Sequence, residues 1–257
     1  MKLIRLSERD QQTLDKILSN RDIKSENQPQ NYADKVVVKP WGFEFLAYEN
    51  DEVAVWFLHI DKGHSTSMHC HPLKKTALTV LRGQALCNTF YNRNYLYGVD
   101  GVVIENGVFH STQALSEGGI DLIEVETPPN KTDLVRLKDQ YGRSGAGYEG
   151  LSEMKTDNLD RYNYFAFNTP ENNQEDNHIG NGYKVSILTV PSKTEAAQFM
   201  NFERGVFYCS CAGDLVQANG ETALTTGDVA EGAYLETCDS LITTRQTTLL
   251  RFEPNLK

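Results

Sequence analysis

Short β-type runs, separated by glycine and by Asp-Gly or Gly-Asp turns, make up most of the chain from residue 34 onward. No amphipathic helical pattern separates these runs, which argues against a parallel α/β fold. The sequence therefore predicts an all-β protein whose antiparallel strands form barrels or sandwiches. The expected strands cover residues 34–39, 42–49, 52–60, 77–83, 84–92, 101–105, 111–116 and 120–127, and then 162–168, 183–190, 196–202, 204–213, 214–220, 221–228, 233–238 and 240–253.

The order of these runs divides the 257 residues into two halves. Each half has a strand ending in glycine, a hairpin, a Gly-Asp or Asp-Gly turn and a final apolar strand, which indicates a degenerate internal duplication. Ser7 offers an N-cap to a short N-terminal helix. We expect an N-terminal helix and linker at 1–34, a first barrel at 35–127, a charged connector at 128–159 and a second barrel at 160–257.

The acidic balance of the chain limits its partners. The formal net charge is -10, whereas nucleic acids and anionic membranes favour basic surfaces, so we expect neither as a partner. No run reaches the roughly 18 apolar residues of a membrane span, and the N-terminus becomes charged too early for a secretory signal. Five cysteines, an odd number without disulfide-framework spacing, indicate reduced thiols in a cytoplasmic protein.

Three of the six histidines are spaced so that they could share a metal ion. His69 and His71 alternate along an extended segment, so both imidazoles point to one face, which in a small barrel is the interior. His110 follows a glycine turn and could bring a third imidazole to the same place. Such a set suits one divalent transition metal, with Zn, Fe, Ni and Mn as candidates, and leaves positions open for water or substrate. The alternative is that all three are ordinary core or loop histidines.

The other three histidines are not expected to bind metal. His59 shares strand parity with large apolar side chains, which favours packing over ligation. His64 and His178 lie in polar stretches and are expected to be exposed loop residues.

The pattern around the histidines resembles the cupin superfamily. The matching residues are Gly63, His69, His71, Gly83, Gly107 and His110. KPWGFEFL at 39–46 and DLVRLKDQYGR at 133–143 resemble the opening and closing motifs of the type II phosphomannose isomerase cupin domain, and similar cupins occur in surface-polysaccharide biosynthesis. The second half resembles another cupin that lacks the ligands. The resemblance implies a bicupin, with two double-stranded β-helix (jelly-roll) barrels in tandem and one metal site, and we expect a homodimer.

Two positions depart from the cupin pattern. Lys74 and Lys75 stand in the region of the motif's glutamate, and Glu105 replaces a proline. A charged lysine is no metal ligand, but near a metal it could neutralise a substrate anion or act as a base. We favour Lys75, because it shares strand parity with the two histidines if the extended geometry persists past Pro72. Lys74 remains an alternative, and the pair could equally be a solvated turn.

Two carboxylates on a late strand are further catalytic candidates. Glu124 and Glu126 alternate with Val125, so both lie on one face. Pointing inward, they could bind sugar hydroxyls or move protons. We expect at least one of them to lie on a solvated outer face.

Residues of the two flanking motifs are candidates for substrate binding. Lys39 and Trp41 could present a cation and a ring that stacks on a sugar, although Trp41 could equally belong to the core. Arg136, Tyr141 and Arg143 match the closing motif. Either arginine could hold a phosphate, and an ion pair with a nearby aspartate is an equally good alternative.

These residues support three hypotheses of function. The leading one is a metal-dependent isomerase or epimerase that acts on a sugar phosphate or a nucleotide-linked sugar. The second is a three-histidine Fe(II) dioxygenase. The third is a non-catalytic sugar-binding cupin. Metal identity and oxygen use would separate the first two, and tight binding without turnover would indicate the third.

Overall fold

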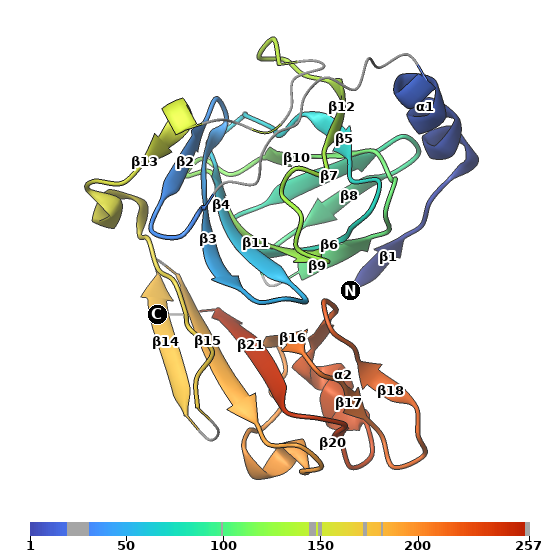
Figure 1. The fold of residues 1–257 in the computed structure, drawn as a ribbon, viewed down its shortest axis with the longest axis vertical. Helices are drawn as coiled ribbons and strands as arrows, with labels where there is room; N and C mark the ends of the chain where they lie inside the picture. Colours follow the sequence, from blue (N-terminus) through green and yellow to red (C-terminus); the bar gives the residue numbers. More distant parts are fainter. Residues whose placement is uncertain are drawn as a thin grey trace.

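The computed structural model describes residues 1–19, 31–98, 100–143, 148, 151–171, 174–180 and 182–254. They form two β domains, one stacked on the other, with the first at the top of Figure 1 and the second at the bottom. The architecture is all-β, as the sequence predicts, with a short helix near the N-terminus. Most of the linker expected after that helix lies outside the described residues.

The first domain consists of two sheets that enclose a core. Their strand orders are β1-β9-β6-β11-β4-β3-β2-β13 and β12-β5-β10-β7-β8. The pairs are antiparallel except β1 with β9. The bounds are β1 (Lys2–Ile4), β2 (Val36–Lys39), β3 (Gly42–Glu49), β4 (Ala54–Ile60), β5 (Met68–Cys70), β6 (Lys75–Arg82), β7 (Ala85–Thr89), β8 (Arg93–Leu96), β9 (Asp100–Ile104), β10 (His110–Ala114), β11 (Ile120–Thr127), β12 (Val135–Lys138) and β13 (Met154–Lys155).

The second domain also pairs two sheets, with the orders β14-β15-β21-β16-β19 and β18-β17-β20. Its core is separate from that of the first domain. The bounds are β14 (Glu175–Gly180), β15 (Tyr183–Val190), β16 (Phe207–Ala212), β17 (Leu215–Val216), β18 (Thr222–Leu224), β19 (Val229–Glu231), β20 (Ile242–Thr243), β21 (Thr247–Pro254) and the helix α2 (Gly232–Thr237). Three 3-10 turns lie at Leu151–Glu153, Leu159–Tyr162 and Ala196–Gln198.

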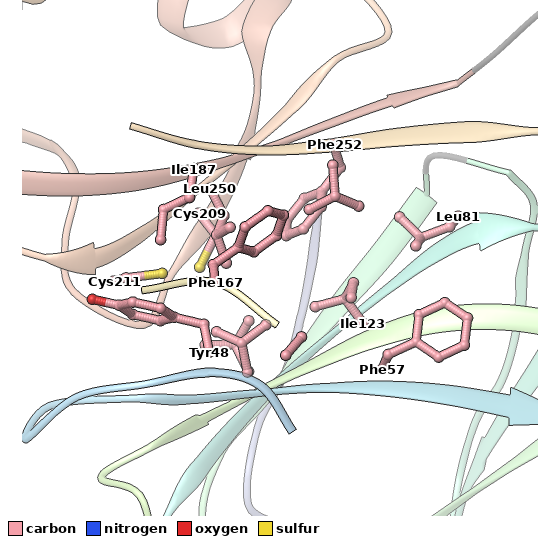
Figure 2. Packing of buried hydrophobic residues seen from close by; sticks show 14 of the residues in the cluster. Tyr48, Phe57, Leu81, Ile123, Phe167, Ile187, Cys209, Cys211, Leu250 and Phe252 are labelled. Carbon is pink, nitrogen blue, oxygen red and sulfur yellow. The ribbon is translucent and has the colours of Figure 1, made fainter. Parts of the chain in front are cut away.

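A large apolar cluster joins the two domains. Phe57 and Ile123 extend from the outer face of the eight-stranded sheet toward Ile187, Leu250 and Phe252 of the second domain (Figure 2). All five side chains are at most 2% exposed. Burial of apolar area on this scale is the main attraction that holds the domains together.

Polar contacts surround this apolar interface. The ammonium of Lys75 lies 2.5 Å from the carboxylate of Asp228. The side-chain amide of Asn50 donates to the carbonyl oxygen of Cys211 at 2.9 Å. Gly227 packs so tightly that a Cβ there would lie 1.9 Å from Oγ1 of Thr127, so the turn before Asp228 requires glycine.

The helix α1 (Glu8–Ser19) is fixed to the first domain by one buried carboxylate. The backbone N–H of Asp10 donates to the hydroxyl of Ser7 at 3.2 Å, which confirms the predicted cap. The carboxylate of Asp10 in turn accepts from the backbone N–H of Phe109 at 2.9 Å. The cap of α1 therefore also holds the residue before His110.

Three predicted strands of the second half are wrong. Residues 162–168 follow a 3-10 turn without pairing, 196–202 begin as another such turn, and most of 233–238 lies in α2. Apolar residues in these segments, such as Phe165, Phe167, Met200 and Leu235, are buried by tertiary packing, which does not require a sheet. The expected connector also contributes strands to the first domain, since β12 pairs with β5 and β13 with β2.

No helix among the described residues has the length and the apolar character needed to cross a membrane.

A fragment ending at Lys155 is predicted to aggregate or self-associate. It retains the first domain's sheets but uncovers the apolar face that the second domain buries. Size-exclusion chromatography with light scattering, beside the full chain, checks this. A soluble, monomeric fragment with unchanged metal content would contradict it.

Candidate metal centre and its cavity

Pairing of β10 with β5 brings the three candidate histidines together. His110 lies directly opposite His69 across these antiparallel strands. His71 follows the end of β5 and is buried, like His110. One ring nitrogen from each residue lies within 4.8 Å of the others. The predicted convergence of these side chains is therefore confirmed.

Backbone carbonyls fix the tautomer of each ring. Nδ1 of His69 lies 2.8 Å from the carbonyl oxygen of Ser67, and Nδ1 of His110 lies 3.0 Å from that of Val108. Nδ1 of His71 lies 2.6 Å from the carbonyl oxygen of Asp133. A carbonyl only accepts hydrogen bonds, so each Nδ1 carries the proton and each Nε2 keeps its lone pair.

The three imidazoles are held in the neutral form. Burial lowers the pKa of His110 to about 4. Burial, with the nearby charges of His110, Arg136 and Lys74, lowers the pKa of His69 well below its usual value. Burial and Lys74 have the same effect on the pKa of His71. Neutral imidazole is the form that binds metal.

These residues fit a divalent transition metal. Nε2 of His71 is buried and has no hydrogen-bond partner among the described residues. Such an atom costs free energy unless it meets a ligand. Three imidazole nitrogens, on rings whose other nitrogen is held by a backbone carbonyl, suit a metal such as Zn, Fe or Ni. No second group of three metal-ligating side chains occurs in the described part of the chain.

Two of the three histidines, His69 and His71, lie in the wall of a cavity of about 450 Å³, solvent-open space included. The wall combines cations, carboxylates and rings from both sheets. Its residues are Lys39, Trp41, Glu44, Leu58, Thr66, Ser67, His69, His71, Lys74, Glu124, Glu126, Lys131, Leu134, Arg136, Arg143 and Tyr148. We name this space the histidine cavity.

A buried pair between Lys74 and Glu126 lies in this wall. The ammonium is 2.8 Å from the carboxylate, and both side chains are 1% exposed. Lys131 lies 3.3 Å from the same carboxylate. Burial raises the pKa of Glu126, but the charges and hydrogen bonds of Lys131 and Lys74 outweigh it, so its pKa is lowered. Glu126 therefore remains ionised at neutral pH.

A second buried pair, between Lys39 and Glu44, lies beside the first. Their charged atoms are 3.3 Å apart, and Lys131 lies 3.2 Å from the same carboxylate. The hydroxyl of Tyr148 donates a hydrogen bond to the carboxylate of Glu44. Burial raises the pKa of Glu44, but Lys131 and Lys39 outweigh it and lower the pKa to about 2. Lys131 thus connects the two carboxylates.

Glu124 is the carboxyl group nearest to the histidines. Its Oε1 lies 3.8 Å from Nε2 of His71. Burial raises its pKa to about 7, with Glu126 and Glu44 acting in the same direction against Lys131 and Lys74. Glu124 and Glu126 both face the cavity, so the expectation that at least one lies on a solvated face is wrong. Ile123 and Val125 occupy the outer face instead.

The structure separates the roles of the two lysines. Lys74 lines the histidine cavity, whereas Lys75 pairs with Asp228 of the second domain. The preference for Lys75, based on parity with the histidines, is therefore not supported. The segment after Pro72 is a bend before β6 begins, so the alternation of the extended segment is interrupted.

Residues 130–133 hold the turn that carries Lys74. The ammonium of Lys74 donates to the carbonyl oxygen of Asn130 at 2.9 Å. The carboxylate of Asp133 accepts from the backbone N–H groups of Leu73 at 2.8 Å and Lys74 at 3.0 Å. Because the carbonyl of Asp133 also holds His71, this segment connects the lysine turn to the metal centre.

Four of the five candidates from the flanking motifs line the cavity. Lys39, Trp41, Arg136 and Arg143 line it, with Arg136 directly beside His69 where β12 pairs with β5. Arg143 also pairs with Asp139 at 2.9 Å. Tyr141 is not in the cavity wall, and its hydroxyl donates to the carbonyl oxygen of Ser65 at 3.2 Å.

The remaining histidines lie outside the centre. His59 stacks on Phe43 at 5.1 Å and lies 2.6 Å from Asp121, in agreement with a packing role. His64 is exposed. The expectation of a loop residue is wrong for His178, which lies on β14 and stacks on Phe165 at 4.3 Å.

Among the cavity residues that sequence reasoning missed, three belong to the buried ion-pair network: Glu44, Lys131 and Tyr148. Glu44 stands between two phenylalanines in the run FEF, a pattern typical of an outward glutamate. Lys131 and Tyr148 lie in the charged segment taken as a connector. The only signal for Glu44 was its parity with Lys39 across a hairpin.

Comparison with known proteins finds cupin-type structures. No protein-family model and no curated protein matches the chain. An RmlC-like cupin from Shewanella frigidimarina is 19% identical over 42% of this chain and 95% of its own, with a TM-score of 0.35. A sugar phosphate isomerase of the cupin superfamily from Silicibacter pomeroyi is 13% identical over 33% of this chain and 56% of its own (TM-score 0.31). The capsular polysaccharide assembling protein CapF from Staphylococcus aureus is 19% identical over 40% of this chain and 34% of its own (TM-score 0.37).

Methionine in place of each lysine should destabilise the protein by very different amounts. Lys74→Met leaves the buried carboxylate of Glu126 without its closest cation, which should lower the free energy of unfolding by about 3–5 kcal/mol. Lys75→Met removes a partly exposed pair and should cost less than about 1 kcal/mol. Urea denaturation measures both. Equal losses would contradict the assignment of Lys74 to the buried network.

The metal-free protein should depend on His110 for its stability in acid. Because burial lowers this pKa from 6.5 to about 4, the folded state binds fewer protons than the unfolded chain between these pH values. The free energy that His110 contributes is therefore lost as pH falls, by about 3 kcal/mol at pH 4.

As pH falls from 6.5 to 4, the variant His110→Gln should lose less of its free energy of unfolding than the parent loses. Glu124 has a raised pKa, so its titration stabilises the folded state as pH falls. Because both chains contain Glu124, the difference between them reports His110. Thermal melting of chelator-treated protein across this range measures the difference. Parallel curves would show that His110 is not held neutral.

Proposed function

We propose that the protein is a metal-dependent isomerase or epimerase acting on a phosphorylated or nucleotide-linked sugar, as used in surface-polysaccharide biosynthesis. The supporting observation is a buried carboxyl group, Glu124, placed 3.8 Å from Nε2 of His71 in a cavity whose wall carries more cations than carboxylates. Both reactions move a proton to and from a carbon beside a carbonyl group. They therefore need a base next to an electrophile.

Glu124 has the properties of that base. Its pKa of about 7 leaves both the carboxylate and the carboxylic acid populated at neutral pH. In an isomerisation, this one group can take the proton from the sugar carbon and return it to the neighbouring carbon. Glu126 is kept ionised by two lysines, so the adjacent carboxylates have different protonation states. That difference favours Glu124 over Glu126 for proton transfer.

The charges of the wall favour an anionic substrate. Five cationic side chains face three carboxylates, an excess of two positive charges when all are ionised and the histidines neutral. Arg136 lies beside His69, and Arg143 also lines the cavity. Guanidinium groups bind phosphate oxygens well because their donors match the geometry.

The histidines would hold the metal through Nε2. A divalent ion there would supply a Lewis acid that polarises an oxygen of the sugar. Trp41, whose side chain is 4% exposed, borders the same cavity and would limit the orientation of the sugar ring.

The metal assignment is tested with the double variant His69→Ala/His71→Ala. The purified parent should contain about one equivalent of transition metal per chain, and the double variant should lose it. Elemental analysis measures both. Unchanged metal content in a folded double variant would show that the site is wrong.

Proton transfer is tested by exchange with solvent. The protein loaded separately with Zn, Fe, Ni or Mn is incubated in D₂O with a panel of aldose and ketose phosphates, and NMR detects deuterium next to the carbonyl. Glu124→Gln should lower the rate of exchange by about 10²–10⁴ at unchanged metal content. In the parent, the rate should rise with pH as Glu124 becomes ionised, and the variant should lose this pH dependence.

The other outcomes separate the competing functions. Oxygen uptake by the iron form with substrate would indicate a dioxygenase. Binding without exchange in every metal form would indicate a non-catalytic sugar-binding protein. Either result would overturn the isomerase proposal.

A further inference from the structure

A second cavity lies behind the histidine cavity. It measures about 510 Å³, solvent-open space included. Its wall includes Tyr32, Trp56, Glu126, Asn130, Lys131 and Thr132. Glu126 and Lys131 line both cavities, so one ion pair forms part of the partition between them. We name this space the rear cavity.

Two wall residues of the rear cavity carry buried polar atoms without partners. Nε1 of Trp56 and Oε2 of Glu126 have no hydrogen-bond partner among the described residues, and both residues are 1% exposed. The first atom is a donor and the second an acceptor. Leaving both without a partner is costly, so the cavity favours an occupant that both donates and accepts hydrogen bonds. A hydroxyl group does this.

The charge of the rear cavity disfavours an anion. Its charged residues are two carboxylates, Glu49 and Glu126, and one ammonium, Lys131. The ammonium already contacts Glu126 and Glu44 at 3.3 and 3.2 Å. No positive charge remains in excess, in contrast to the histidine cavity. An anionic occupant is therefore disfavoured.

The remaining wall suits a polyhydroxylated ligand. Tyr32 and Trp56 border the cavity with their ring centroids 5.2 Å apart in an edge-to-face arrangement, and the ammonium of Lys131 covers one face of Trp56 at 3.7 Å. Asn130 and Thr132 add an amide and a hydroxyl. Apolar ring surface beside groups that both donate and accept hydrogen bonds suits a sugar, which offers C–H faces and hydroxyls.

We propose that the rear cavity is a binding subsite for a neutral sugar unit. On the proposed function, this unit is a non-reacting part of the substrate, and the anionic reacting unit occupies the histidine cavity. The substrate is then a molecule of at least two parts, one charged and one neutral. Binding energy from the neutral part would orient the reacting part.

The two tryptophans of the chain allow each cavity to be observed separately. Trp41 lines the histidine cavity and Trp56 the rear cavity. An ¹⁵N-labelled, zinc-loaded protein should therefore give two indole N–H signals, which Trp41→Phe assigns. Methyl α-D-glucopyranoside and methyl α-D-mannopyranoside should shift the Trp56 signal. Inorganic phosphate should shift the Trp41 signal.

Variants locate the sugar. Thr132→Val removes one hydroxyl and should weaken sugar binding two- to tenfold. Ala54→Leu fills part of the rear cavity and should abolish the shift of Trp56 while the response to phosphate is retained. Thr222→Val, on the exposed surface of β18, is the matched control and should change neither response.

The result that overturns the proposal is a Trp56 signal that no neutral sugar shifts, which would mean that water alone fills the rear cavity. A shift that persists unchanged in both Thr132→Val and Ala54→Leu would place the sugar elsewhere. These measurements record binding without turnover. The sugar subsite can therefore be disproved while deuterium exchange still supports the proposed function, and the proposed function can be disproved while sugar still binds in the rear cavity.

Discussion

Burial of both faces of the eight-stranded sheet determines where the charged groups of the protein lie. The second domain covers the outer face, and the apolar side chains of β3 and β11, such as Phe45 and Ile123, pack against it. Because side chains alternate along a strand, their neighbours Glu44, Glu124 and Glu126 must point inward. The carboxylates of the cavity are thus placed by the apolar contact between the two domains.

Three inward carboxylates in turn require cations. A buried ionised carboxylate is strongly unfavourable unless it is paired and hydrogen-bonded. Lys39 pairs with Glu44, Lys74 with Glu126, and Lys131 contacts both carboxylates. Lysine at position 74 is therefore explained by the network it neutralises. The same pairing leaves Glu124 as the least compensated carboxyl group, and its pKa is raised accordingly.

The sequence predicted the features that depend on local pattern. Alternation of His69 and His71 and the glycine turn before His110 were sufficient to predict a shared site, and most strands of the first half follow from their periodicity. The direction of Glu124 was not predictable, because IEVE fits either orientation until the outer face is known to be covered. Lys131 reaches the cavity from a segment without periodicity, and its contacts join residues far apart in the chain.

The buried network also explains how lysines and a metal centre share one cavity. The ammonium of Lys74 contacts the carboxylate of Glu126 and the carbonyl oxygen of Asn130. Because these partners compensate its charge, it repels a metal cation at the histidines less. A glutamate at this position, as in the cupin motif, would place a fourth carboxylate in the wall beside Glu126 and remove one of the cations that neutralise it. The motif's carboxylate and this network are therefore mutually exclusive solutions. Glu124, on the neighbouring strand β11, is instead the carboxyl group that lies near the histidines.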